Sequence, residues 1–160
     1  MLETVLTITS MQTPEEAWAF KTLNEEWIAR IFAIEEADRI ILDYPLENIV
    51  NKGGDVLIAR AGDSIIGCVA LVPTGASVFE LSKMCVTPES RGRGYGRRII
   101  HAAINRASEL GATLLFLGSS TKLPNAIHLY ESVGFKHVPV EQITPMPYVR
   151  ADIFMELELK

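Results

Sequence analysis

The chain has few cysteines and no long hydrophobic run, and these absences exclude several classes of protein. Its only cysteines, Cys68 and Cys85, lie in apolar stretches, and neither belongs to a C-x-x-C pair or has a histidine at metal-site spacing. No run of 18 or more apolar residues occurs, and the first residues lack the basic segment of a secretory signal. We therefore expect a cytoplasmic protein without a membrane span or a bound metal, in which both cysteines are core residues.

Repeats, low-complexity segments and linkers are also missing, which favours one folded unit. With 160 residues, of which 48% are hydrophobic and 22% charged, the chain is long enough to bury a sizeable core. We expect a single domain that spans residues 1–160.

Basic residues are in the minority, but four of them are grouped in one short stretch. The formal net charge is -5, which argues against nucleic acid as a main partner. Four arginines nevertheless fall within eight residues: Arg91, Arg93, Arg97 and Arg98. A local positive site on an acidic chain suits a small polyanion.

Hydrophobic periodicity and turn residues predict the element order β-α-α-β-β-β-α-β-α-β-β. The first helix is expected to begin at Thr13-Pro14-Glu15-Glu16, which supplies an N-cap, a proline at the first helical position and a glutamate at the third. We expect Trp27 and Phe32, at its far end, to be core residues, with substrate contact as the alternative. The expected strands are Glu3 to Thr9, Asp55 to Arg60, Ile65 to Val72, Val78 to Val86, Thr113 to Leu117, Phe135 to Val140 and Arg150 to Leu159.

A glycine-rich turn, Arg91 to Gly96, stands between an expected strand and an expected helix. Such a turn exposes backbone N–H groups at the positive end of the helix dipole, so it is typical of a phosphate cradle. The spacing argues against a dinucleotide fingerprint, because Arg97 and Ile99 stand where glycine is needed. It also argues against a Walker loop, whose Gly-Lys-Ser/Thr end is missing. The alternative is a helix lead-in that binds nothing.

Two motifs resemble those of one enzyme family. Arg-x-x-Gly-x-Gly, filled by Arg91, Gly94 and Gly96, resembles the acetyl-CoA pyrophosphate loop of the Gcn5-related N-acetyltransferases (GNAT). The segment from Asn125 to Phe135 resembles the helix that carries the family's asparagine and tyrosine, followed by its Gly-Phe corner. The element order is similar over nearly the whole chain. The resemblance implies an α/β (α+β) acyl-CoA N-acyltransferase fold, with a mixed, mostly antiparallel sheet flanked by helices and a splayed parallel strand pair that holds CoA.

The resemblance also implies acetyl-CoA as the co-substrate and assigns residues to it. Backbone N–H groups near Cys85 and Val86, at an expected strand bulge, would meet the developing oxyanion. Asn125 would bond the pantetheine arm, cap its helix, or do both. The residues expected to contact acetyl-CoA are Cys85, Val86, Arg91, Gly92, Arg93, Gly94, Tyr95, Gly96, Asn125 and Tyr130.

Two side chains are candidates for proton transfer. Tyr130 is protonated at neutral pH because the unperturbed phenol pKa is about 10, and its place in the family pattern makes it the general acid for the leaving thiolate. The alternative is a packed tyrosine whose hydroxyl is bonded elsewhere. Glu80 is the candidate to deprotonate the incoming amine, directly or through a water, and the alternative is a solvated residue or an ion-pair partner. His128 is a weaker candidate for the base.

The acceptor is the least determined part of the reaction. The family places the acceptor pocket at the first two helices and the loop from Glu141 to Val149. Arg150 at the end of this loop would read a carboxylate on an amino-acid-like substrate, or it would start the last strand and face solvent. We expect direct acetylation of a primary amine of a small molecule. A protein lysine or N-terminus as acceptor, a non-catalytic acetyl-CoA-binding module, and a homodimer remain open alternatives.

Overall fold

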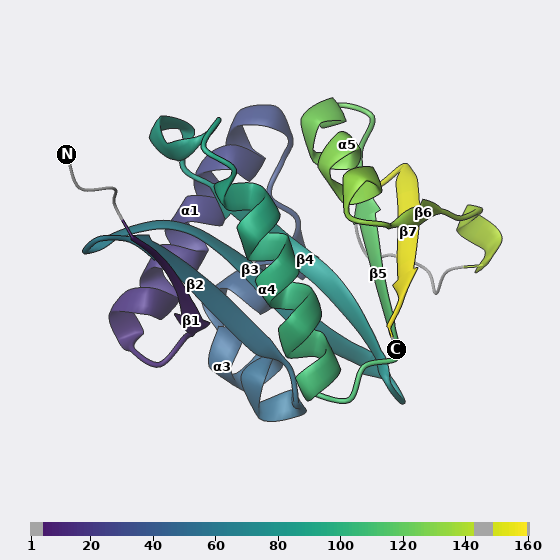
Figure 1. Cartoon of the computed structure of the whole chain (residues 1–160), viewed down its shortest axis with the longest axis horizontal. Coiled ribbons are helices and arrows are strands. Elements are labelled where there is room, and N and C mark those ends of the chain that lie inside the picture. The colour runs from purple at the N-terminus through teal and green to yellow at the C-terminus, as the bar shows by residue number, and fades with distance from the viewer. Residues whose placement is uncertain (1–4, 143–148, 160) are drawn as a thin grey trace.

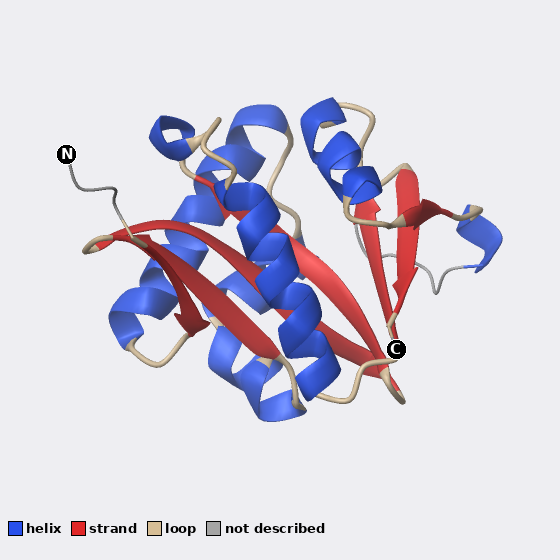
Figure 2. Cartoon of the chain, viewed as in Figure 1, coloured by secondary structure: helices blue, strands red, loops and turns tan. Residues whose placement is uncertain are grey.

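The computed structural model of the chain describes residues 5–142 and 149–159. In these ranges, one seven-stranded sheet has helices on both of its faces (Figure 1, Figure 2). The strands lie in the order β1-β2-β3-β4-β5-β7-β6. Their bounds are β1 Leu6–Ser10, β2 Asp55–Ala61, β3 Ser64–Gly75, β4 Val78–Val86, β5 Leu114–Ser119, β6 Lys136–His137 and β7 Ile153–Glu158.

The helices follow the expected order. The α-helices are α1 Pro14–Ile31, α2 Glu36–Asp43, α3 Pro45–Asn48, α4 Tyr95–Glu109 and α5 Pro124–Ser132, and short 3-10 helices span Val50–Lys52, Pro88–Ser90 and Val140–Gln142. At the start of α1 the capping box is formed: the Glu16 N–H donates to Oγ1 of Thr13 at 3.1 Å, and the Thr13 N–H donates to the Glu16 carboxylate at 3.2 Å. None of the helices in the described ranges has the length and apolar character that a membrane crossing requires.

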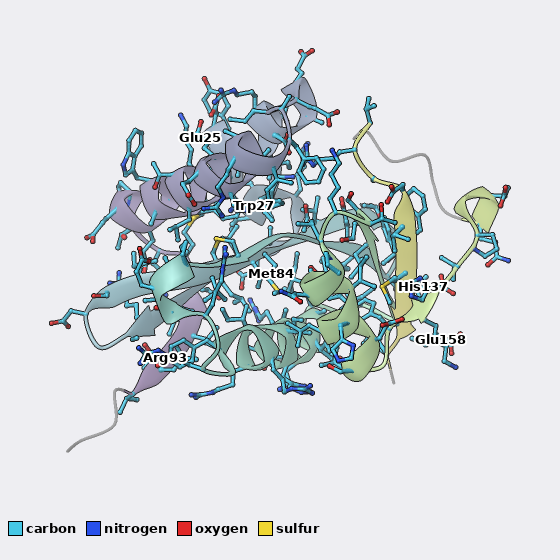
Figure 3. All side chains as sticks on the ribbon, turned by 90° about the horizontal axis from the view of Figure 1, so that it is seen from above. Glu25, Trp27, Met84, Arg93, His137 and Glu158 are labelled. Carbon is cyan, nitrogen blue, oxygen red and sulfur yellow. The ribbon has the colours of Figure 1, made fainter. Side chains whose placement is uncertain are left out.

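Two hydrophobic cores lie on opposite faces of the sheet. Helices α4 and α5 cover one face, where Ile100 and Leu115 are fully buried. Helices α1, α2 and α3 cover the other, where Phe20 and Ile28 are fully buried. Figure 3 shows the sheet edge-on between the two helical layers, with the labelled Met84 on the α4 side of the sheet. The sheet is therefore the middle layer of three.

The parallel pair β4 and β5 separates soon after it forms. Val78 to Glu80 pair with Leu114 to Phe116, and no further pairs follow between these two strands. Figure 1 shows the two strands close together near the C-terminus of the chain and diverging away from it. The expected splayed parallel pair is therefore present.

A bulge in β4 lies at the point where the strands diverge. Cys68 and Ala70 of β3 face Cys85 and Ser82 of β4, so β4 carries one extra residue between these pairs. Lys83 takes up the distortion with a φ of 56°, in the left-handed region. The extra residue reverses the alternation, so that Leu81 and Met84 both pack toward α4.

The last two strands are shorter than the sequence predicts. Strand β6 ends at His137, although Val138 still donates to the Phe154 carbonyl at 2.9 Å. Pro139 has no N–H with which to continue the ladder. Strand β7 begins at Ile153, so the expectation that it starts at Arg150 is wrong. Residues 143–148 of the expected acceptor loop lie outside the described residues.

Candidate active site

A cleft of about 760 Å³ opens where β4 and β5 separate. Its walls come from the end of α1, from β4, from the loop that leads into α4, from α5, and from residues 150–151. Of the site residues expected from sequence, those that line it are Glu80, Cys85, Val86, Arg91, Gly92, Gly94, Tyr95, Gly96, Asn125, Tyr130 and Arg150. Arg93 is exposed and is not part of the lining. The cleft thus brings together residues that are far apart in the sequence.

The glycine turn leaves the start of α4 open to the cleft. Gly92 and Gly94 both have a φ of +78°, a conformation that strains any residue with a side chain. Gly94 is the N-cap and offers no side chain to the first helical N–H groups, and a Cβ built on it would meet no atom within 4 Å. The N–H groups of the first turn therefore face the space in which an anion would lie.

The arginines near this turn also hold the fold together. Arg91 donates from Nε to the Val86 carbonyl at 3.1 Å, which ties the turn to the end of β4. Arg97 donates to Oγ of Ser132 at 2.9 Å, which links α4 to α5. Both arginines line the cleft, so their charges also contribute to its positive potential.

Gly96 has a packing role rather than a conformational one. A Cβ at this position would lie 3.1 Å from Cδ2 of Leu129 on α5 and 3.8 Å from Cε of Met84 on β4. Glycine therefore lets the first turn of α4 approach α5 closely at the floor of the cleft.

Tyr130 projects from α5 into the cleft from a buried position. It is 8% exposed, and its ring packs edge-on against Phe135, with the centroids 5.9 Å apart. Burial raises the pKa of Tyr130 to about 12, so its phenol remains protonated at neutral pH. Such a group can donate a proton but cannot act as a base near pH 7.

Asn125 lies near the start of the same helix and lines the cleft. The residue at the N-cap is Leu123, and no side-chain hydrogen bond caps the helix. The helix-capping alternative for Asn125 is therefore wrong. Asn125 is exposed and lines the cleft, so its amide is accessible to a ligand there.

Glu80 is the last β4 residue paired with β5, and it stands at the point where the cleft begins. Burial raises its pKa from 4.5 to about 7, and the positive charge of Lys83 partly opposes that shift. Its carboxyl group therefore changes protonation state near neutral pH, which suits a general base.

A partly buried cluster of four charges lies beside Glu80, and sequence reasoning missed three of its members. Nζ of Lys83 lies 3.0 Å from Oδ1 of Asp38. Arg150 binds the same carboxylate with two nitrogens, at 2.6 and 2.8 Å, and also donates to Glu35 at 3.2 Å. We call these residues the acceptor-side cluster: Glu35, Asp38, Lys83 and Arg150. The signal in the sequence that could have revealed this cluster was Lys83, because it stands at a position of β4 where the alternating pattern places a buried residue.

An aromatic and cationic rim borders the same end of the cleft. The Phe32 and Trp27 rings stand edge-to-face, with centroids 6.5 Å apart, and both line the cleft. Nζ of Lys122 lies 5.5 Å from the Phe32 centroid and Cζ of Arg150 lies 5.8 Å from it. Trp27 and Phe32 also pack against the core, as expected, and substrate contact by these residues stays a prediction.

The histidines contribute little to this arrangement. His128 lines the cleft and is exposed, and His137 contacts Glu131 at 2.9 Å on the surface. Across residues 5–142 and 149–159, no three or more His, Cys, Asp or Glu side chains are grouped as a metal site would need.

Comparisons with known proteins agree with this geometry. A family model described as an acetyltransferase (GNAT) domain matches residues 52–137. An uncharacterised N-acetyltransferase of Schizosaccharomyces pombe is 28% identical over 96% of this chain and 95% of its own length. A GNAT acetyltransferase structure from Staphylococcus aureus superposes with a TM-score of 0.88 at 19% identity, covering 98% of this chain and 100% of the other. A putative acetyltransferase of Salmonella typhimurium, solved with acetyl-CoA, has a TM-score of 0.74 at 20% identity and covers 97% and 94%.

Proposed function

The chain belongs to the GNAT family of acetyltransferases, and from this premise we propose that it acetylates a primary amine of a small molecule in the cytoplasm, as a single domain. It is an acetyl-CoA-dependent N-acetyltransferase. One observation carries the choice of a small acceptor. The Val149 N–H donates to the Glu35 carboxylate at 3.0 Å, and Arg150 binds Asp38, so the start of α2 and residues 149–150 form a wall at the acceptor end.

A small acceptor is compatible with this fold. A spermidine N-acetyltransferase chimera is among the solved structures of similar fold, at 22% identity and a TM-score of 0.72. The wall formed by Glu35, Asp38 and Arg150 would restrict a folded protein surface more than it would restrict a free amine.

Positive groups at one end of the cleft suit the pyrophosphate of acetyl-CoA. The open N–H groups at the start of α4, with Arg91 and Arg97, would hold the pyrophosphate. Asn125 would bond the pantetheine arm along the other wall. When bound, acetyl-CoA supplies an activated acetyl thioester.

Glu80 is the residue that we assign to deprotonation of the amine. The attacking amine must be neutral, so the proton of its ammonium form has to leave before or as the C–N bond forms. A carboxylate with a pKa of about 7 accepts that proton, directly or through a water, without being fully protonated at neutral pH. Lys83 and Arg150 bind the Asp38 carboxylate and offset its negative charge.

Tyr130 is the residue that we assign to the leaving sulfur. As the C–S bond breaks, the thiolate needs a proton, and the Tyr130 hydroxyl supplies one from inside the cleft. Backbone N–H groups near Cys85 and Val86 lie beyond the last β4–β5 pair, where β4 has left its partner strand. We assign the stabilisation of the developing oxyanion to them.

An amine panel assayed by release of the CoA thiol tests the proposal. We expect acetylation of one or more free primary amines and little activity on lysine peptides or N-terminal peptides. Activity on peptides alone would replace the small-molecule acceptor with a protein acceptor. Tight acetyl-CoA binding without turnover on any amine or peptide would favour the non-catalytic alternative.

A further inference from the structure

The cleft is lined by more positive than negative side chains. Among the described lining residues, the cationic ones are Arg30, Lys83, Arg91, Arg97, Lys122 and Arg150. The only carboxylate in this part of the lining is Glu80. The counter-charges of these cations decide how much of this positive charge an entering acceptor meets.

Most of these cations already have a counter-charge or a task. Arg91 and Arg97 stand at the pyrophosphate end. Arg30 pairs with Glu26 at 2.9 Å. Lys83 and Arg150 share the two carboxylates of the acceptor-side cluster, so two positive charges meet two negative ones.

Among the described residues, Lys122 has neither a carboxylate partner nor a place at the pyrophosphate end. In the part of the chain that the structure describes, its ammonium group has no carboxylate within ion-pair distance. Asp152 lies near this loop, but it accepts hydrogen bonds from the N–H and hydroxyl of Thr121, at 2.9 and 3.1 Å, and it does not line the cleft. The charge of Lys122 is therefore uncompensated at the acceptor end.

The two cations beside the Phe32 ring make the rim unsuitable for an acceptor that carries a second positive charge. An aromatic face is a common neutral site for an ammonium group, but two protein cations already approach this ring, Lys122 at 5.5 Å and Arg150 at 5.8 Å. A ligand carrying a second ammonium group would meet like charges here. An anionic group would be attracted to the same two cations.

We propose that the amine substrate carries an anionic oxygen group, a carboxylate or a phosphate, and that Lys122 receives this group at the rim formed with Phe32. This inference rests on the proposed small-molecule acetyltransferase function. It gives Lys122 a role in substrate specificity. Arg150 is then a fixed part of the cleft wall, because Asp38 and Glu35 orient its guanidinium group.

Matched amines test the charge preference and separate the two sources of anion. The carboxylate arm compares amino acids with their amides and with their decarboxylated amines, and the phosphate arm compares O-phosphoethanolamine with ethanolamine. Putrescine represents the dications. We expect kcat/KM to be highest for the anionic member in at least one arm. Preference for putrescine or for the neutral members in both arms would overturn the proposal, while acetylation itself would still support the proposed function.

Variants of Lys122 test the assignment of the residue. Lys122→Met should raise KM for the anionic amine by about three- to tenfold, because an exposed charge-assisted contact is lost, while KM for its neutral analogue stays the same. Lys122→Arg should retain most of the preference. Lys52→Met is the matched control, since Lys52 is exposed on the 3-10 helix Val50–Lys52, away from the cleft lining. Equal effects on both amines, or a raised KM for acetyl-CoA instead, would overturn the role of Lys122.

A binding experiment keeps this inference separate from the proposed function. Calorimetry of the protein with CoA present compares an N-acetylated amino acid with its amide, and no turnover is needed. Tighter binding of the acid, reduced in Lys122→Met, supports the anion site even if the amine panel shows no acetylation. Equal binding of acid and amide contradicts the site, whatever the panel shows.

Discussion

Lys83 and Asp38 form an ion pair that is almost completely buried: Nζ lies 3.0 Å from Oδ1, and the two side chains are 2% and 0% exposed. Burial alone raises the pKa of Asp38, but the Arg150 hydrogen bonds and the charge of Lys83 outweigh it and lower the pKa to about 2. Burial lowers the pKa of Lys83, while Asp38 opposes that shift. Each charge is tolerated in the interior because the other is present.

The stability of the pair can be measured with three variants. Asp38→Asn should lower the free energy of unfolding by about 3 kcal/mol, because it removes the carboxylate that lies 3.0 Å from the buried Lys83 ammonium group. Lys83→Met should cost less, since Asp38 keeps its bidentate contact with Arg150. The double variant should be more stable than Asp38→Asn alone. Urea unfolding gives all three values, and strictly additive losses would show that the pair is not coupled.

The rate should depend on the protonation of Glu80. With a pKa of about 7 for this carboxyl group, kcat/KM for the amine should rise through neutral pH and level off above it. Glu80→Gln should lower kcat/KM by about 10²-fold or more at high pH and remove the rise. The profile is measured with two amines of different pKa, because a rise set by the amine would move with it. An unchanged rise in the glutamine variant would assign the base to another group, such as His128.

Glu80 should also affect the stability of the fold, with a definite sign. The folded protein holds the proton of Glu80 up to a pKa of about 7, whereas the unfolded chain releases it near 4.5. The folded state therefore binds more protons between these values, and this group makes the fold less stable as pH rises through that window. Relative to the parent protein, Glu80→Gln should gain up to about 3 kcal/mol between pH 4.5 and pH 8. Urea unfolding at both pH values would reveal a constant difference if the shift were absent.

The glycine turn can be tested with a matched pair of substitutions. Gly94 and Gly111 both have a positive φ, +78° and +91°, and a Cβ on either would meet no atom within 4 Å. Gly94→Val and Gly111→Val should therefore cost similar stability, of about 1–2 kcal/mol each. Only Gly94→Val should weaken acetyl-CoA binding, by about tenfold or more, because its side chain blocks the approach to the helix N–H groups. Calorimetry showing equal binding by the two variants would move the pyrophosphate elsewhere.

Tyr130→Phe isolates the leaving-group proton. The variant keeps the ring and its edge-on contact with Phe135, so stability and acetyl-CoA affinity should change little. Turnover should fall by about 10²-fold, since only the hydroxyl is removed. If turnover stays at the parent level, the proton comes from solvent.

Local signals in the sequence were enough to predict the helix start and the glycine turn near the site. The Thr13 capping box and the Gly94 turn are specified by residues within a few positions of one another, and both are formed as expected. The acceptor-side cluster was not foreseen, because Asp38 and Lys83 meet only after the sheet and α2 have packed together. A lone lysine in a strand ordinarily indicates a solvated edge. In this chain β4 is a central strand, and the bulge places Lys83 on the α2 side of the sheet, where Asp38 is buried.

The short β4–β5 pairing leaves two strand edges in the middle of a sheet. Beyond Glu80 and Phe116, neither strand has the other as its hydrogen-bonding partner. Unpaired edges at the margin of a sheet invite association with other chains. These two face each other across a narrow cleft under α4 and α5, where a third polypeptide strand would have to enter between them. The fold therefore shelters backbone groups from aggregation while leaving them available to a slender ligand that carries amides of its own.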